Sequence, residues 1–220
     1  MFTQRYKSYA LISHFNTGDT SGTTVHPKIG PTFSVASTDG VASTNGTPYG
    51  AGYALQHTGS GGFTLTSALP SGIWAGDFVI QFWYRHNGTQ GVYAWGTSHR
   101  KMFATGATSE LHSIHYNVSS YQIVAFGVSL IPSTGYGNSR WIHHVVAKSG
   151  TSIIGGFDGK LGTVKTVGAL SGQYMAAGAT TTRDNASGYI SDLNIQSGSG
   201  VANSWLNNSS GTYTLPTSYT

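Results

Sequence analysis

Apolar and polar residues alternate along many short stretches of this chain. The alternation is clearest in residues 77–85, where Phe78, Ile80, Phe82 and Tyr84 share one face of a predicted strand. Further strand-like segments are bounded by Gly, Asn or Ser and lie at residues 9–15, 63–66, 91–96, 111–118, 121–128, 141–148, 152–157 and 188–195. Segments spaced by roughly 8–12 residues are typical of β-sandwiches. The pattern predicts an all-β, two-sheet antiparallel β-sandwich with residues 77–85 as a central strand.

Turn-forming residues divide the chain further. Asp158 and Gly159 stand between two apolar stretches, which predicts a type I′ hairpin because both central residues of that turn need positive φ. Residues 20–52 are rich in Gly, Thr, Ser and Pro and are expected to form long loops with one or two short strands. We expect residues 1–8 to form an arm, residues 9–197 the sandwich, and residues 198–220 a wrap on the same domain. The anchors of the wrap are expected to be Val201, Trp205, Tyr213 and Leu215, and the chain shows no amphipathic helix of useful length.

Composition points to an exterior protein. Hydrophobic residues make up 38% of the chain, enough for a core, but charged residues make up only 8%. Ser, Thr, Asn and Gly must therefore cover much of the surface. Such a neutral polar surface is typical of proteins on the exterior of a cell or particle. The N-terminal residues lack the apolar core of a signal peptide, and no run reaches the ~18 apolar residues of a membrane helix. Exterior character without an export signal favours a virion location and no membrane partner.

Two function classes lose support from composition. The formal charge of +4 comes from 11 basic residues that form no dense cluster, which argues against a nucleic-acid partner. Cysteine is absent, so no thiol nucleophile, disulfide framework or cysteine-based zinc site is available.

Several segments, taken in order, resemble the concanavalin A-like, laminin-G-like domains common in phage structural proteins and exterior bacterial proteins. These segments are residues 11–15, 57–63, 76–83, 141–147, 157–160 and 188–195, and the tail at 200–202 and 215–216 is also similar to phage versions. The resemblance implies a jelly roll whose relatives bind glycans or proteins, assemble, or in distant branches hydrolyse glycosides. Fold alone does not choose among these functions.

The acidic residues argue against catalysis. A glycoside hydrolase needs two carboxylates that flank the scissile bond. The seven acids, none in the closely alternating triplet of the glucanase branches, are Asp19, Asp39, Asp77, Glu110, Asp158, Asp184 and Asp192. We therefore expect a non-catalytic virion surface or structural protein, such as a capsid decoration protein or a fibre or tail accessory module, with a weak glycan-binding face. The alternatives are a free carbohydrate-binding lectin module and, third, a glycoside hydrolase.

The expected partners follow from this interpretation. They are capsid or tail proteins of the virion, glycans, and further copies of the chain in a homo-oligomer, which the N-terminal arm and the long tail favour. The contacts would depend mainly on aromatic and aliphatic burial, with little ionic contribution.

No cofactor is expected. Many relatives hold a structural calcium with acidic oxygens, but this chain has Thr58, Gly62 and Ser191 where the family often has acids, which leaves Asp192 as the candidate ligand. The alternative for Asp192 is a carboxylate that accepts hydrogen bonds from nearby backbone donors. Adjacent residues on a strand point to opposite faces, so His143 and His144 cannot chelate a metal as a pair and are expected to be buried sheet residues.

Aromatic residues supply the candidate contact surface, because exposed Trp and Tyr rings stack on sugars and anchor protein interfaces. Trp83 lies on the strand face opposite Phe82, together with Gln81 and Arg85. The candidates for glycan or subunit contact are Trp83, Tyr84, Tyr93, Trp95, Tyr116, Tyr121 and Tyr136. Phe78, Phe82, Trp141 and Tyr189 are instead expected in the core.

Overall fold

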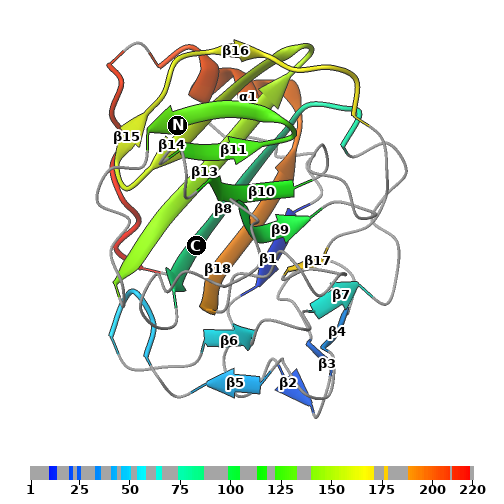
Figure 1. Cartoon of the computed structure of the whole chain (residues 1–220), viewed down its shortest axis with the longest axis vertical. Helices are drawn as coiled ribbons and strands as arrows, with labels where there is room; N and C mark the ends of the chain where they lie inside the picture. The colour runs from blue at the N-terminus through cyan, green and yellow to red at the C-terminus, as the bar shows by residue number, and fades with distance from the viewer. Residues whose placement is uncertain are drawn as a thin grey trace, which may run out of the picture.

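The protein is a two-layer β-sandwich in the computed structural model (Figure 1). The described residues are 10–13, 20–21, 24–25, 33–35, 41–43, 46–50, 54–57, 63–65, 74–86, 99–104, 113–117, 122–132, 140–170, 176–177, 188–208 and 210–218. Side chains are described at 46–50, 54, 74–85, 123–131, 140–170, 188–208 and 210–218. The predicted two-sheet antiparallel architecture is confirmed.

The first sheet, here the main sheet, carries the longest strands. In its order β15-β14-β13-β8-β18-β6-β5, β8 is the central strand, as predicted, with β1 and β16 attached to β18 and β14. The strand bounds are β1 Ala10–Ser13, β5 Val41–Ser43, β6 Ala54–His57, β8 Phe78–His86, β13 Trp141–Ser149, β14 Ser152–Phe157, β15 Lys160–Leu161, β16 Lys165–Thr166 and β18 Gly188–Ser197.

The second sheet is built from shorter strands in the order β12-β11-β10-β9-β17-β7-β4-β3-β2. Their bounds are β2 Thr20–Ser21, β3 Thr24–Val25, β4 Phe33–Val35, β7 Phe63–Leu65, β9 His99–Ala104, β10 Ser113–Asn117, β11 Gln122–Ala125, β12 Val128–Pro132 and β17 Ala176–Ala177. The strands β9 and β17 were not predicted, and the predicted strand at 91–96 lies outside the described residues. The described parts of residues 20–52 form four short strands, β2 to β5, where one or two were expected.

The core between the sheets follows from alternation in the central strand. Phe78, Ile80, Phe82 and Tyr84 are fully buried on the inner face of β8. They join inward residues of β13 and β18 and, from the second sheet, Ile123, Ala125 and Leu130. Area removed from water on this scale is the main favourable contribution to folding.

Two tight hairpins shape one edge of the sandwich. The predicted type I′ turn is confirmed, because Asp158 and Gly159 have φ of 50° and 86° and Phe157 pairs with Lys160. Phe126 and Gly127 form a second turn with φ of 52° and 76°, which divides the predicted strand 121–128 into β11 and β12. Phe126 is an unfavourable residue at positive φ, but its ring is buried 5.6 Å from that of Phe78.

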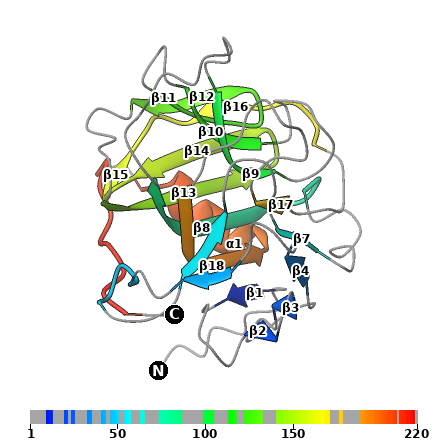
Figure 2. The same cartoon turned by 60° about the horizontal axis from the view of Figure 1, so that its bottom comes forward.

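The C-terminal region covers part of the outer face of the main sheet. It contains a helix, α1 (Ser199–Leu206), where the sequence predicted none. Val201, Ala202, Trp205 and Leu206 pack with Tyr213 on an outer cluster formed by Val79, Val145, Ala147, Ile154 and Leu161. Figure 2 shows α1 on the side of the main sheet away from β10, β11 and β12. Both faces of β8 are therefore covered at this end of the strand.

Beyond α1, the chain runs along the β15 edge (Figure 1). The Leu161 amide donates to the Gly211 carbonyl at 2.8 Å, and the Tyr213 amide donates to the Gly159 carbonyl at 2.9 Å. We call residues 208 and 210–213 the C-terminal strap. Within the described part of the chain, no helix is long and apolar enough to cross a membrane.

Candidate functional site

The outer face of the main sheet carries a row of three side chains from neighbouring strands. Antiparallel pairing places Trp141 of β13 and Tyr189 of β18 directly opposite Arg85 of β8. Directly opposed side chains on one face of a sheet lie about 5 Å apart, so their side chains meet. The row, called here the Arg85 row, is the candidate functional site.

The two rings flank the guanidinium group of Arg85. Its central carbon lies 4.4 Å from the centre of the Tyr189 ring and 5.3 Å from the centre of the Trp141 ring. Both distances fall within the range of cation–π attraction. Arg85 and Trp141 are partly exposed, whereas Tyr189 is 6% exposed. The row thus presents a positive charge and an indole ring to solvent.

The guanidinium has no anionic partner among the described residues. Its contacts there are the two rings, and it makes neither an ion pair nor a hydrogen bond. A guanidinium group carries five N–H donors in one plane and stays charged at all relevant pH values. Arg85 therefore offers donors that the described part of the protein leaves available.

A buried polar network lies two residues from Arg85 along β8, around Trp83. The Trp83 Nε1 donates to the Tyr49 hydroxyl at 2.8 Å, and that hydroxyl donates to the Asp192 Oδ2 at 2.9 Å. Tyr49 reaches this position from a tight turn in which Thr47 and Gly50 exchange backbone hydrogen bonds. The network anchors the 46–50 turn to the main sheet.

Asp192 occupies a β-bulge. The pairing of β18 with β8 shifts register between Ser191 and Asn194, and Asp192 has φ of 48°. Asp tolerates this left-handed conformation better than most residues. The bulge keeps Ile190, Leu193 and Ile195 in the inner core despite the break in alternation. It also brings the 4% exposed Asp192 to Tyr49.

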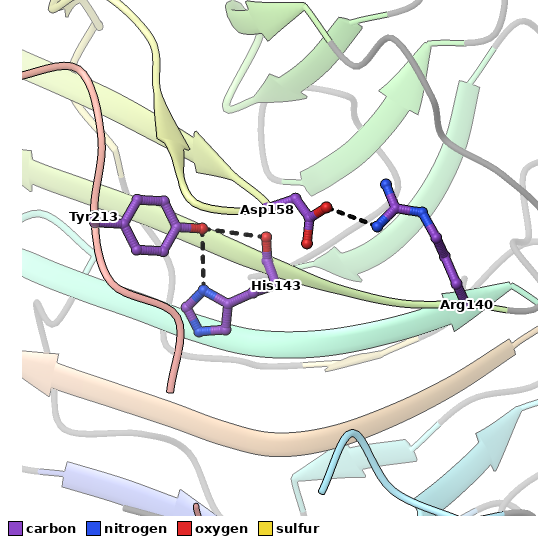
Figure 3. A network of polar contacts seen from close by, with 4 residues as sticks. All are labelled: Arg140, His143, Asp158 and Tyr213. Atoms are coloured by element: carbon purple, nitrogen blue, oxygen red, sulfur yellow. Dashed lines mark hydrogen bonds and ion pairs between the residues drawn. The ribbon is translucent and has the colours of Figure 1, made fainter. Parts of the chain in front are cut away.

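A third group of polar contacts ties the C-terminal strap to β13 (Figure 3). The Tyr213 hydroxyl lies 3.1 Å from Nδ1 of His143 and 3.4 Å from the His143 carbonyl oxygen. Burial lowers the pKa of His143 to about 3 and raises the pKa of Tyr213. The Asp158 amide also donates to the His143 carbonyl, at 2.9 Å, so the hairpin turn and the strap meet at one residue.

The adjacent histidines point to opposite faces, as predicted. His144 is fully buried in the inner core, where its ring stacks on Phe82 at 5.0 Å and meets Phe157 edge-on at 5.7 Å. Burial, together with the nearby His143 and Arg140, lowers the pKa of His144 to about 3. Both histidines are therefore neutral at pH 7.

The described carboxylates are engaged in structural contacts. Asp77 accepts hydrogen bonds from the Gly150 amide at 2.8 Å and the Ser149 hydroxyl at 3.0 Å, which confirms its role beside the start of a strand. Asp158 forms an ion pair with Arg140 at 2.6 Å. Asp192 belongs to the network described above. The other four acids, Asp19, Asp39, Glu110 and Asp184, lie outside the described residues.

A calcium site at Asp192 does not fit the residues described. One carboxylate oxygen already accepts the Tyr49 hydroxyl, and calcium requires six to eight oxygen ligands, with several from carboxylates. Within the described ranges, no group of three or more His, Asp or Glu side chains is placed to hold a metal ion.

Of the predicted contact residues, the structure describes the side chains of Trp83 and Tyr84. Trp83 is 7% exposed and bonded to Tyr49, and Tyr84 is fully buried, so neither is an exposed stacking surface. The expected exposure of these two rings was wrong, because Tyr49 covers Trp83 and the second sheet covers Tyr84. Tyr116 lies in β10, where side chains are not described, and Tyr93, Trp95, Tyr121 and Tyr136 lie outside the described residues.

Trp141, expected in the core, is partly exposed, whereas Tyr189 is buried as expected. Phe78 and Phe82 are in the inner core as predicted, but Trp141 is partly exposed and Tyr189 is buried on the outer face, where both flank Arg85. The sequence did show Arg85 on the same face as Trp83. It held no signal for the register that places the Trp141 and Tyr189 rings opposite it.

A separate surface groove of about 710 Å³ lies where β12, the 161–165 segment and the C-terminal region meet. Half of its described lining residues are aliphatic, among them Leu130, Ile131, Leu161 and Val164. None of the described residues that line it is aromatic, so they do not form a stacking surface like that of the Arg85 row.

Comparison with known proteins gives a likeness of fold. No family model and no curated protein sequence matches the chain. Among solved structures, Trypanosoma rangeli sialidase in complex with the inhibitor DANA is similar with a TM-score of 0.57 and 10% identity, over 84% of this chain and 30% of the sialidase. The botulinum neurotoxin serotype D binding domain is similar with a TM-score of 0.58 and 11% identity, over 86% of this chain and 47% of that chain.

The chain thus spans less than half the length of either structure. At these identities the likeness shows the fold alone, a two-sheet β-sandwich.

Proposed function

We propose that this chain is a non-catalytic glycan-binding module of an exterior surface and that the Arg85 row is its contact site. The observation that carries the proposal is the partly exposed Trp141 ring beside a guanidinium group with available donors. An aromatic ring packs against the apolar C–H face of a sugar, while N–H donors bind its oxygens. Sugar sites generally combine a few rings with a few placed polar groups.

The non-catalytic part of the proposal draws support from the described acids. Asp77 accepts a hydrogen bond beside the start of a strand, Asp158 forms an ion pair, and Asp192 accepts a hydrogen bond from a buried hydroxyl group. A glycosidase instead directs two carboxyl groups at one bond, about 5–9.5 Å apart. We accordingly expect binding of glycans without their cleavage.

The location we propose is a virion surface, as a capsid decoration protein or a fibre or tail accessory module that assembles with copies of itself. Its support is the charged fraction of only 8% and the sequence resemblance to phage structural domains. Antibody labelling of purified particles tests the location, and light scattering of the purified chain tests self-association. Unlabelled particles and a monomer at high concentration would favour a free lectin module.

A glycan array tests the binding function. We expect the wild-type protein to retain at least one glycan, and Trp141→Ala to lose about tenfold or more in affinity, because the stacking surface is removed. Lys165→Ala is the control, since Lys165 is exposed on β16 and takes no part in the Arg85 row. A silent array for wild-type protein contradicts the proposal.

A further inference from the structure

We infer that the Arg85 row recognises an acidic sugar and binds its carboxylate through the Arg85 guanidinium. The inference rests on the proposed glycan-binding function and adds the chemical class of the ligand. Three features of the row lead to it: the charge of Arg85, the position of that charge, and the ring beside it.

The charge of Arg85 is not balanced by the described acids. Asp158 pairs with Arg140, Asp192 accepts from Tyr49, and Asp77 accepts from Ser149 and Gly150. A cation that is partly withdrawn from water and has no counter-ion attracts anions more strongly than a fully solvated one. The row therefore favours a ligand that brings a negative charge.

The two rings hold the guanidinium in place before any ligand arrives. Tyr189 and Trp141 flank it at 4.4 Å and 5.3 Å, which limits the rotamers of a long side chain. A guanidinium held in this way loses less conformational entropy when it binds. Its planar fork of donors matches the two oxygens of a carboxylate.

The surroundings favour a sugar carboxylate over a phosphate chain. A nucleic acid or polyphosphate needs a row of cations, whereas the row holds one guanidinium, and the chain has only 11 basic residues. Trp141 supplies an apolar ring beside the guanidinium, which suits a pyranose face next to its own carboxylate. An acidic peptide side chain would satisfy Arg85 but would leave this stacking surface without a matching face.

The test compares acidic glycans with their neutral counterparts on the wild-type protein. An array carries oligosaccharides with uronate or sialate residues, each beside the same oligosaccharide with its carboxyl group reduced to an alcohol. We expect at least one acidic glycan to bind and its reduced form to bind at least tenfold more weakly. We also expect binding to weaken as salt rises from 50 mM to 500 mM, because the contact is ionic.

Variants connect the effect to Arg85. Arg85→Gln should lower affinity for the acidic glycan about tenfold or more while leaving binding of the reduced glycan little changed. Arg85→Lys keeps the charge but loses the fork, so its affinity should lie between wild type and Arg85→Gln. Lys165→Gln removes one positive charge elsewhere on the surface and should have no effect. The comparison of glycans on wild-type protein needs no variant and so stands even where a variant unfolds.

The outcomes separate this inference from the proposed function. If neutral and acidic glycans bind equally and Arg85→Gln binds like wild type, the inference is overturned while glycan binding stands. If no glycan of either kind binds, the proposed function itself fails. Arg85-dependent binding of an acidic peptide without any glycan binding would overturn the inference in favour of a protein partner.

Discussion

The hydroxyl oxygen of Tyr213 lies 3.1 Å from Nδ1 of His143, so a residue of the C-terminal strap is bonded to a buried residue of β13 (Figure 3). The Tyr213 ring also packs edge-on against Trp205 at 5.2 Å. One tyrosine thus connects α1, the strap and the main sheet, and it packs against the outer cluster.

Removal of this hydroxyl should loosen the strap. Tyr213→Phe keeps the ring but leaves the buried Nδ1 of His143 without its described partner, which costs about 1–3 kcal/mol in the free energy of unfolding. Urea denaturation followed by tryptophan fluorescence measures the change. The exposed neighbour Thr214 provides the control variant Thr214→Ala, which should behave like wild type. Equal stability of Tyr213→Phe and wild type would contradict a structural role for this hydrogen bond.

Mild acid should destabilise the protein through the buried histidines His143 and His144. The pKa values of His143 and His144 are lowered from 6.5 to about 3 in the folded state, so the unfolded chain binds more protons between those pH values. Stability therefore falls as pH decreases below 6.5, by about 1.4 kcal/mol per pH unit for each histidine. Urea unfolding at pH 7.5, 6.5, 5.5 and 5.0 measures this slope.

A variant isolates the contribution of the inner histidine. His144→Leu removes one buried titrating group and should flatten the pH dependence by about half, whatever its effect on stability at pH 7.5. A wild-type stability that stays constant from pH 6.5 to pH 5.0 would rule out neutral buried histidines.

Close packing between the sheets should make Gly162 intolerant of a side chain. A Cβ atom at this position collides with the Leu130 backbone carbonyl oxygen of β12, which cannot rotate away. We expect Gly162→Ala to cost about 1–3 kcal/mol in thermal or chemical unfolding. The matched control is Gly200→Ala in α1, where nothing lies within 4 Å of the added atom. Alanine favours helix, so this control should gain up to about 1 kcal/mol. Similar stabilities for the two variants would contradict the close approach.

The buried network should depend on the Tyr49 hydroxyl. Tyr49→Phe leaves the Trp83 Nε1 without its acceptor and removes a donor from Asp192, at a cost of about 1–3 kcal/mol. Asp192→Asn keeps an acceptor oxygen and tolerates the left-handed backbone, so it should cost less than Asp192→Ala. Differential scanning calorimetry gives the order of stability. The network model fails if Asp192→Ala is as stable as Asp192→Asn.

Local patterns in the sequence predicted the long strands of the main sheet but missed its short strands β6, β15 and β16. The alternation in residues 77–85 predicted β8 and its inner face, and the Asp158-Gly159 pair predicted a type I′ turn. Both features are local, because the side-chain period of a strand and the φ of a turn are set by a few consecutive residues.

Other local features escaped the pattern because tertiary contacts decide them. Phe126 enters the left-handed region, normally a glycine position, since its ring is buried against Phe78. Helix α1 has a weak amphipathic pattern and no side-chain cap, and it packs on the outer cluster of the main sheet. Packing outweighs the local preference in both cases.

The sequence by itself determined that the chain forms short alternating strands, and hence two stacked sheets with a neutral polar surface. Only the tertiary structure decided which aromatic rings are covered by other segments and which remain at the surface. Trp83 is covered by Tyr49, while Trp141 and Tyr189 flank Arg85. The physical reason is that alternation assigns a residue to a face of its own strand. Strand register and the packing of distant segments such as the 46–50 turn and α1 then decide what that face meets.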